Sequence, residues 1–98
     1  MTDKLARKSA AHAWKAQQRV HAREKLPLAA ERLKALFDAL DIELPKRGCD
    51  HTLRFVQEWC RRTDADFAPL CAWLNDNGGF CDCEVLANCE EVFAEAMR

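Results

Sequence analysis

Hydrophobic side chains recur every three or four residues along most of the chain, which is the spacing of one face of an α-helix. The clearest run predicts a helix that begins near Pro27, since proline is tolerated in a first turn. We expect it to end near Asp41, ahead of Leu44-Pro45, because the residue before a proline is pushed out of the helical region. Its inward positions are Ala29, Leu33, Leu36, Phe37 and Leu40.

Two shorter runs predict two further helices. Asp50 caps the first of them, which extends to Arg62, and Asp64 or Asp66 opens the second. Asn77-Gly78-Gly79 ends the second, because glycine readily adopts the left-handed conformation that closes a helix. The inward positions are Leu53, Val56, Trp59 and Cys60 in the first, then Phe67, Leu70, Cys71 and Leu74 in the second.

Helical spacing returns near the end of the chain and predicts a last helix from about Glu84 to Met97. Residues 80–87 also suit a short strand, and the pattern leaves both interpretations open. The predicted fold is therefore all-α: a small bundle of four to five helices with one irregular corner. The inward positions of the last helix are Val85, Leu86, Cys89, Val92, Phe93 and Met97.

Charge divides the chain into two parts. Residues 1–25 contain seven Lys and Arg side chains and two acidic ones, so they carry +5 of a total of −1, and residues 26–98 carry −6. Residues 2–25 are helix formers with a weak apolar stripe, and Trp14 is the one bulky member. We expect a basic helical arm over 1–25, which could bind nucleic acid, and a helical domain over 26–98.

Six cysteines in 98 residues raise the question of their redox environment. No apolar run approaches the roughly 20 residues that span a bilayer, and no apolar segment follows the basic N-terminus as in a secretion signal. We therefore expect a cytoplasmic protein without a membrane partner. In that reducing compartment, clustered cysteines are more often metal ligands or redox groups than disulfides.

Two short motifs have the composition of half a metal site each: Cys49-Asp50-His51 and the run Gly78–Glu84, which contains Cys81-Asp82-Cys83. Side chains two residues apart lie about 200° apart around a helix and cannot share a face. They can converge in an extended segment or at the mouth of a helix. Both motifs therefore place their ligands outside regular helix, and folding of the intervening helices as a hairpin would bring them together.

Cys49, His51, Cys81 and Cys83 form a tetrahedral ligand set suited to Zn²⁺. The same set can hold an iron–sulfur cluster. Four protein ligands leave no open position for water, which favours a structural role over catalysis. Three thiolates on Zn²⁺ leave a charge of −1, which Arg54 can offset; Asp50, Asp82 or Glu84 can accept the free ring N–H of His51 and fix its tautomer.

The other three cysteines have a different context. Cys60 and Cys71 lie on inward stripes of predicted helices, where a thiol behaves as a small apolar side chain. Cys89 lies on such a stripe too, but it follows Cys83 by six residues and could replace His51 as a ligand. We therefore keep Cys89 as an alternative ligand.

The chain resembles a bacterial family, the domain of unknown function 2695, over about residues 26–92. The resemblance rests on Leu26-Pro27-Leu28 and residues 33–38, on residues 49–55 and on residues 78–88. The family commonly has an apolar residue such as valine at Cys89, and often tyrosine at Phe80. The resemblance supports the pairing of the two cysteine motifs and implies no activity.

These observations favour a small zinc-stabilised module that binds a protein partner and has no catalysis of its own. Two alternatives stay open. The first is a redox protein or sensor in which Cys81 and Cys83 form a strained, labile disulfide. The second is an accessory protein that binds nucleic acid through residues 1–25.

Overall fold

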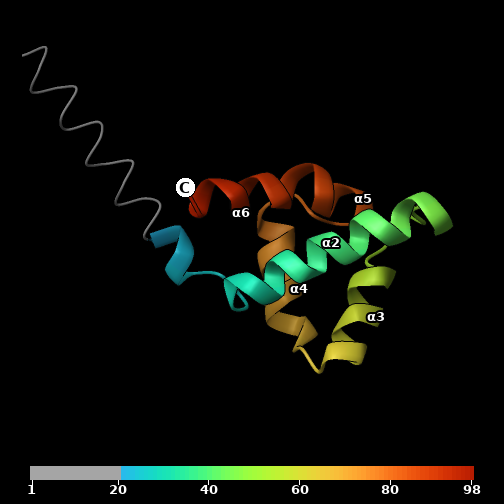
Figure 1. Cartoon of the computed structure of the whole chain (residues 1–98), viewed down its shortest axis with the longest axis horizontal. Helices are drawn as coiled ribbons and strands as arrows, with labels where there is room; N and C mark the ends of the chain where they lie inside the picture. The colour runs from blue at the N-terminus through green and yellow to red at the C-terminus, as the bar shows by residue number, and fades with distance from the viewer. Residues whose placement is uncertain (1–20) are drawn as a thin grey trace, which may run out of the picture.

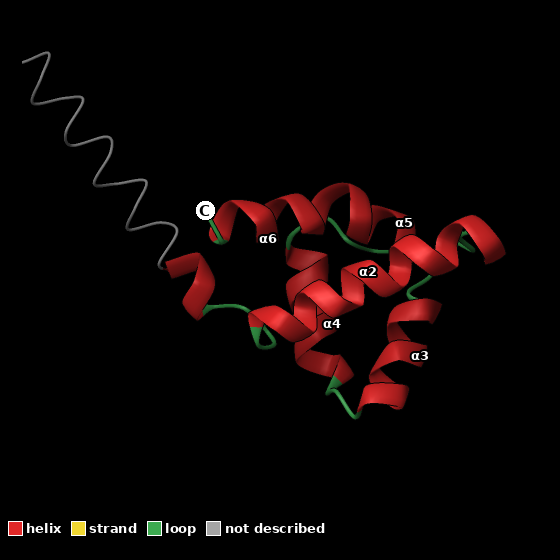
Figure 2. Cartoon of the chain, viewed as in Figure 1, coloured by secondary structure: helices red, strands yellow, loops and turns green. Residues whose placement is uncertain are grey.

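Helices supply all the regular secondary structure of residues 21–98, the part of the chain that the structure, a computed structural model, describes (Figure 2). This confirms the all-α fold, and residues 80–87 form no strand. Residues 21–24 are helical and Lys25 forms a turn, while residues 1–20 of the expected arm helix lie outside the described residues. The elements are α2 (Ala30–Arg47), α3 (Arg54–Thr63), α4 (Phe67–Asp76), α5 (Asp82–Glu84), a π-helix (Val85–Cys89) and α6 (Glu90–Ala96).

The core lies where α2 contacts both α3 and the helical run from α5 to α6 (Figure 1). The predicted stripe of α2 is buried from Leu33 onward, with Leu33 and Leu36 fully inaccessible to solvent, whereas Ala29 is exposed at the N-cap position. The ring of Phe37 packs on that of Phe93, with 5.5 Å between the ring centroids. The inward residues of α3 and α4 complete the core: Leu53, Phe55, Val56, Trp59 and Cys60 from α3 and the residue before it, Leu70 and Leu74 from α4.

The end of α2 differs from the prediction, because the helix continues through Pro45 to Arg47. Proline removes one hydrogen bond of the last turn, but tertiary and terminal contacts hold that turn. Leu44 packs against the core, and Gly48, at φ 72°, donates its N–H to the Leu44 carbonyl at 2.9 Å. The start also differs: the helix begins at Ala30, and Pro27 precedes it rather than lying in its first turn.

Asp50 does not cap α3, which is a second correction. Its Oδ1 accepts hydrogen bonds from the backbone N–H (3.0 Å) and the hydroxyl of Thr52. This closes a small turn within the loop and delays the helix, whose N-cap position is Leu53. The fourth helix follows the prediction, with Asp66 at its N-cap position and Asn77-Gly78 at its end.

A π-helical turn separates α5 from α6 and changes which side chains face inward. Its additional residue rotates everything that follows it around the helix axis. Ala96 is therefore buried, whereas Val92 and Met97, predicted to face the core, are exposed. The turn also packs Cys89 against Gly79 so closely that a Cβ added at Gly79 would lie 2.6 Å from the Cys89 sulfur.

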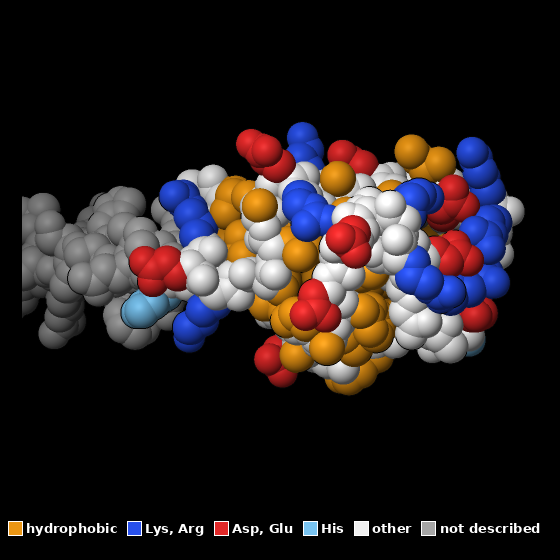
Figure 3. Space-filling view, turned by 90° about the horizontal axis from the view of Figure 1, so that it is seen from below, with side chains coloured by type: hydrophobic (Ala, Val, Ile, Leu, Met, Phe, Trp, Pro, Cys, Tyr) orange, Lys and Arg blue, Asp and Glu red, His pale blue; other side chains and the backbone are white. Residues whose placement is uncertain are grey.

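The surface carries charges of both signs at the end of the molecule formed by the last turns of α2 (Figure 3). There Arg47 pairs with Glu43 at 3.5 Å and with Glu58 at 3.1 Å. At the opposite end, Arg23 donates hydrogen bonds to the carbonyls of Ala96 and Arg98, which ties residues 21–25 to the end of α6. Within residues 21–98, no helix has the length and hydrophobicity needed to cross a membrane.

Candidate metal centre

The two predicted half-sites meet at one corner, where the loop between α2 and α3 lies against the start of α5. One ligand atom from each of Cys49, His51 and Cys81 lies within 4.8 Å of the other two. A nitrogen and two sulfurs at such distances can surround a single ion after small side-chain movements. A Cys-His-Cys group that can hold a metal ion is therefore present, built from segments about 30 residues apart in sequence.

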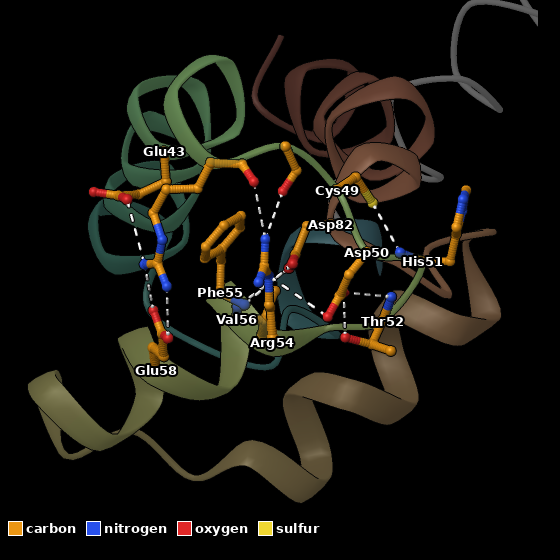
Figure 4. Close-up of polar contacts among 12 residues, drawn as sticks. Glu43, Cys49, Asp50, His51, Thr52, Arg54, Phe55, Val56, Glu58 and Asp82 are labelled. Carbon is orange, nitrogen blue, oxygen red and sulfur yellow. Dashed lines mark hydrogen bonds and ion pairs between the residues drawn. The ribbon is translucent and has the colours of Figure 1, made fainter.

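Cys49 is the central thiol of this corner. Its sulfur accepts a hydrogen bond from the backbone N–H of His51 at 3.4 Å (Figure 4). Burial opposes ionisation of this thiol, but the backbone N–H groups of Cys83 and His51, together with the thiols of Cys83 and Cys81, outweigh it and lower its pKa. These contacts favour the thiolate form of Cys49, which is the form that binds a cation.

The pKa values of Cys81 and Cys83 are raised, in contrast to that of Cys49. Burial is the main cause that raises the pKa of Cys81 to about 11, and interaction with Cys49 adds to it. For Cys83, whose side chain is exposed, the hydrogen bond with Cys49 is the main cause of a raised pKa. Without a cation, three neighbouring thiols cannot all ionise, because their negative charges repel one another. A bound cation would stabilise all three as thiolates.

Cys83 contacts Cys49 but lies outside the three-atom group. The cause is the local backbone: Cys81 is extended, with φ −144° and ψ 169°, while Cys83 already belongs to the first turn of α5. The pair therefore straddles the mouth of a helix, as the spacing of two residues requires. Of the four predicted ligands, the structure brings three together and places the fourth beside Cys49.

His51 adopts a left-handed backbone conformation, with φ 69°. Such a conformation is uncommon for residues other than glycine and costs about 1–3 kcal/mol. The turn closed by Asp50 and Thr52 surrounds it and holds it in place. This backbone places an imidazole nitrogen near two sulfurs, so local strain accompanies assembly of the group.

Asp82 is the buried carboxylate of the corner, and its contacts differ from those expected. Its two oxygens accept hydrogen bonds from the backbone N–H groups of Phe55, at 3.1 Å, and Val56, at 3.2 Å (Figure 4). Its own N–H donates to the Thr52 carbonyl at 3.0 Å. Burial raises the pKa of Asp82, and the two N–H donors of α3 oppose that rise. Asp82 thus caps α3 from a distant part of the chain.

The remaining predicted neighbours of the ligands also have specific partners. Glu84 accepts a hydrogen bond from the Cys81 thiol at 3.4 Å. Arg54 donates to the carbonyls of Arg47, at 3.1 Å, and Gly48, at 2.9 Å, which come directly before Cys49. It therefore holds the loop that presents Cys49.

The other cysteines lie in the helical part of the structure. Cys60 is buried and Cys71 half-buried, as predicted for thiols on inward stripes. Cys89 is fully buried, and its thiol donates hydrogen bonds to the carbonyls of Leu74, at 3.4 Å, and Asn77, at 3.7 Å. Cys89 lies outside the Cys-His-Cys group.

Comparison with known proteins finds relatives of the chain and a matching family model. The uncharacterised proteins Mb2294 of Mycobacterium bovis and Rv2271 of Mycobacterium tuberculosis are each 34% identical over 88 residues, which is 90% of this chain and 89% of theirs. No solved structure shows significant similarity. The model of a family described as proteins of unknown function, DUF2695, matches residues 36–88, which include both cysteine motifs. The chain therefore belongs to the DUF2695 family.

Proposed function

We propose that Cys49, His51, Cys81 and Cys83 bind one structural Zn²⁺ ion that joins the α2–α3 loop to the start of α5. The observation that supports this is the meeting of three ligand atoms within 4.8 Å. Cys83, which already contacts Cys49, would supply the fourth ligand by a side-chain rotation. An iron–sulfur cluster is the alternative for the same donors.

A closed set of four protein ligands gives the ion a structural role rather than a catalytic one. Three thiolates and Zn²⁺ leave one negative charge, which Arg54 and Arg47 would offset. On this proposal the chain is a small cytoplasmic module that binds a protein partner through its folded surface and catalyses no reaction itself.

Elemental analysis tests the metal. The full chain, purified under reducing conditions without added metal, is expected to contain about one zinc per molecule. Cys49→Ser and Cys81→Ser are each expected to lose it, because a tetrahedral site needs every ligand. Cys71→Ser is the matched control, since Cys71 is half-buried like Cys49 but lies in α4. Unchanged zinc content in Cys81→Ser would refute the proposal. Bound iron together with visible absorption would show that the site holds an iron–sulfur cluster and not zinc.

A redox role is the second candidate, and two contacts favour it: Cys81 and Cys83 both contact Cys49. A disulfide between Cys81 and Cys83 closes a small, strained ring, whereas Cys49 offers either of them a partner from another loop. Oxidation by hydrogen peroxide would join two thiols and form two waters. Peptide mapping after mild peroxide treatment should then show a reversible loss of two hydrogens at these cysteines. A persistent pair of free thiols would exclude this candidate.

Nucleic-acid binding stays a proposal for residues 1–25, of which the structure describes 21–25. Its support is the charge of +5 on this segment. If the arm is the binder, affinity for DNA or RNA disappears when residues 1–25 are deleted and weakens with salt in the full chain. If binding survives the deletion, the helical domain binds the nucleic acid.

A further inference from the structure

We infer that Asp82 is a positioning residue that couples metal binding to the start of α3. The inference rests on the proposed zinc site and adds a role that the ligands alone do not explain. Asp82 stands between two proposed ligands, Cys81 and Cys83, yet its carboxylate points to a helix that begins 28 residues earlier in the chain.

The start of α3 lacks a capping group of its own. The first N–H groups of a helix have no partner within the helix, and Ser, Thr, Asp or Asn usually satisfies one of them locally. At α3 the N-cap position is Leu53, which makes no side-chain hydrogen bond to the helix. Asp82 instead satisfies the N–H groups of Phe55 and Val56, 27 and 26 residues away.

Because Asp82 is buried, its carboxylate needs these hydrogen bonds. It is the one charged side chain that is buried in residues 21–98, with 0% of its surface exposed. A buried carboxylate is costly unless it is hydrogen-bonded, and the N-terminus of a helix offers both donors and a partial positive charge. The carboxylate and the first turn of α3 therefore stabilise one another.

The same residue also joins the two metal loops through its backbone. The N–H of Asp82 donates to the carbonyl of Thr52, the residue after His51. An ion held by Cys49, His51, Cys81 and Cys83 would fix the same two stretches of backbone. Because such coupling is reciprocal, the ion should stabilise the contact of Asp82 with α3, and that contact should raise the affinity for the ion.

Zinc affinity of Asp82→Asn provides the first test. Asparagine keeps the size of the side chain but loses the charge and one of the two acceptor oxygens. Competition with a chelator should show zinc binding about tenfold weaker than in the unaltered chain, within the range usual for coupling between two sites. Asp66→Asn is the matched control, because Asp66 precedes α4 and makes no side-chain capping bond; its affinity should not change.

Hydrogen exchange of the unaltered chain provides the second test and needs no variant to fold. With zinc bound, the amides of Phe55 and Val56 should exchange slowly. Removal of zinc by a chelator should accelerate them by about tenfold or more, while the amide of Leu74 in α4 stays protected. This result would locate the effect of the ion at the start of α3.

Three outcomes would overturn the inference in distinguishable ways. Zinc that binds Asp82→Asn as tightly as the unaltered chain would remove the coupling and leave the metal site standing. Exchange that rises equally at Phe55, Val56 and Leu74 would show global unfolding in place of a local link. A purified chain without zinc would refute both the site and the coupling.

Discussion

The six cysteines fall into two sets of three that differ in where the backbone places them. The corner thiols lie at the junction of two loops, contact one another and have an imidazole close by. The helical thiols are separate and pack among apolar side chains or bond to carbonyls. The corner set is Cys49, Cys81 and Cys83, and the helical set is Cys60, Cys71 and Cys89.

This difference teaches that backbone context, more than residue type, decides what a thiol can do. Neighbouring N–H groups and thiols lower the pKa of Cys49 despite its partial burial. Burial, with a smaller contribution from the charge of Glu84, raises the pKa of the Cys89 thiol to about 11. The contacts of Cys49 therefore favour the thiolate that binds a metal, and the burial of Cys89 suits packing.

The largest expected effect is on the stability of the fold, which should fall when a corner thiol is replaced. Cys49→Ser should lower the free energy of unfolding of the zinc-loaded chain by about 2 kcal/mol or more, because a structural ion stabilises the fold through its ligands. For a domain of this size this corresponds to a fall in Tm of roughly 8–16 °C. Thermal unfolding followed by circular dichroism measures it.

A chelator supplies the control for that result. With zinc removed, Cys49→Ser and the unaltered chain should unfold at nearly the same temperature, and Cys71→Ser should follow the unaltered chain with and without zinc. An equal loss of Tm in chelator would mean that Cys49 stabilises the fold by packing, which would erase the distinction between the two sets.

Gly79→Ala should produce the next largest effect, and it disturbs the packing of Cys89, a member of the helical set. The new Cβ would lie 2.6 Å from the Cys89 sulfur and 3.1 Å from the Leu74 carbonyl oxygen. Overpacking of this kind costs about 1–3 kcal/mol, measurable by urea unfolding. The double variant with Cys89→Ala should recover part of the loss, since the effects of substitutions at two residues in contact do not add. Zinc content should stay at one; strictly additive losses would contradict the packing described for Cys89.

Cys89→Ala alone should have a smaller effect. It removes one sulfur from a fully buried position and the donor to the Leu74 carbonyl, at a cost of about 1 kcal/mol. Urea unfolding and elemental analysis on the same sample are the measurements. Loss of zinc from this variant would make Cys89 a ligand and move it from the helical set to the corner set.

Asp50→Ala should have the smallest effect and should act at the corner. It removes the acceptor of the Thr52 N–H and the ion pair with Arg54 at 3.6 Å, which shape the turn around His51. We expect zinc binding to weaken less than in Asp82→Asn, because Asp50 is exposed and water can replace its contacts. A larger loss than that of Asp82→Asn would make Asp50 the main support of the corner.

The composition of the corner was predictable because its signals are local. A C-x-H and a C-x-C motif outside regular helix must place their ligands in loops, and a helical bundle brings such loops together. The structure confirms the all-α fold, and it places one ligand atom from each of Cys49, His51 and Cys81 within 4.8 Å of the other two. The position of Cys83 was harder to foresee, since it depends on α5 beginning between the two cysteines.

The features that sequence reasoning missed depend on contacts between distant residues. Nothing near Asp82 in the sequence indicates that it caps α3. The sequence offered Asp50 as a local cap, whereas the observed N-cap position is Leu53, a poor capping residue. The continuation of α2 past Pro45 depends on Leu44, Gly48 and the packing of the core. The π-helical turn changes the register of the last helix, which local periodicity cannot anticipate.

X-ray absorption at the zinc edge tests the central claim most directly, because it measures the atoms around the ion in the intact chain. A site formed by the three corner thiols and His51 should give three sulfur neighbours near ~2.3 Å and one nitrogen near ~2.0–2.1 Å. The same spectrum should appear for Cys71→Ser. A shell of oxygen and nitrogen alone, or two sulfurs in place of three, would contradict the ligand set.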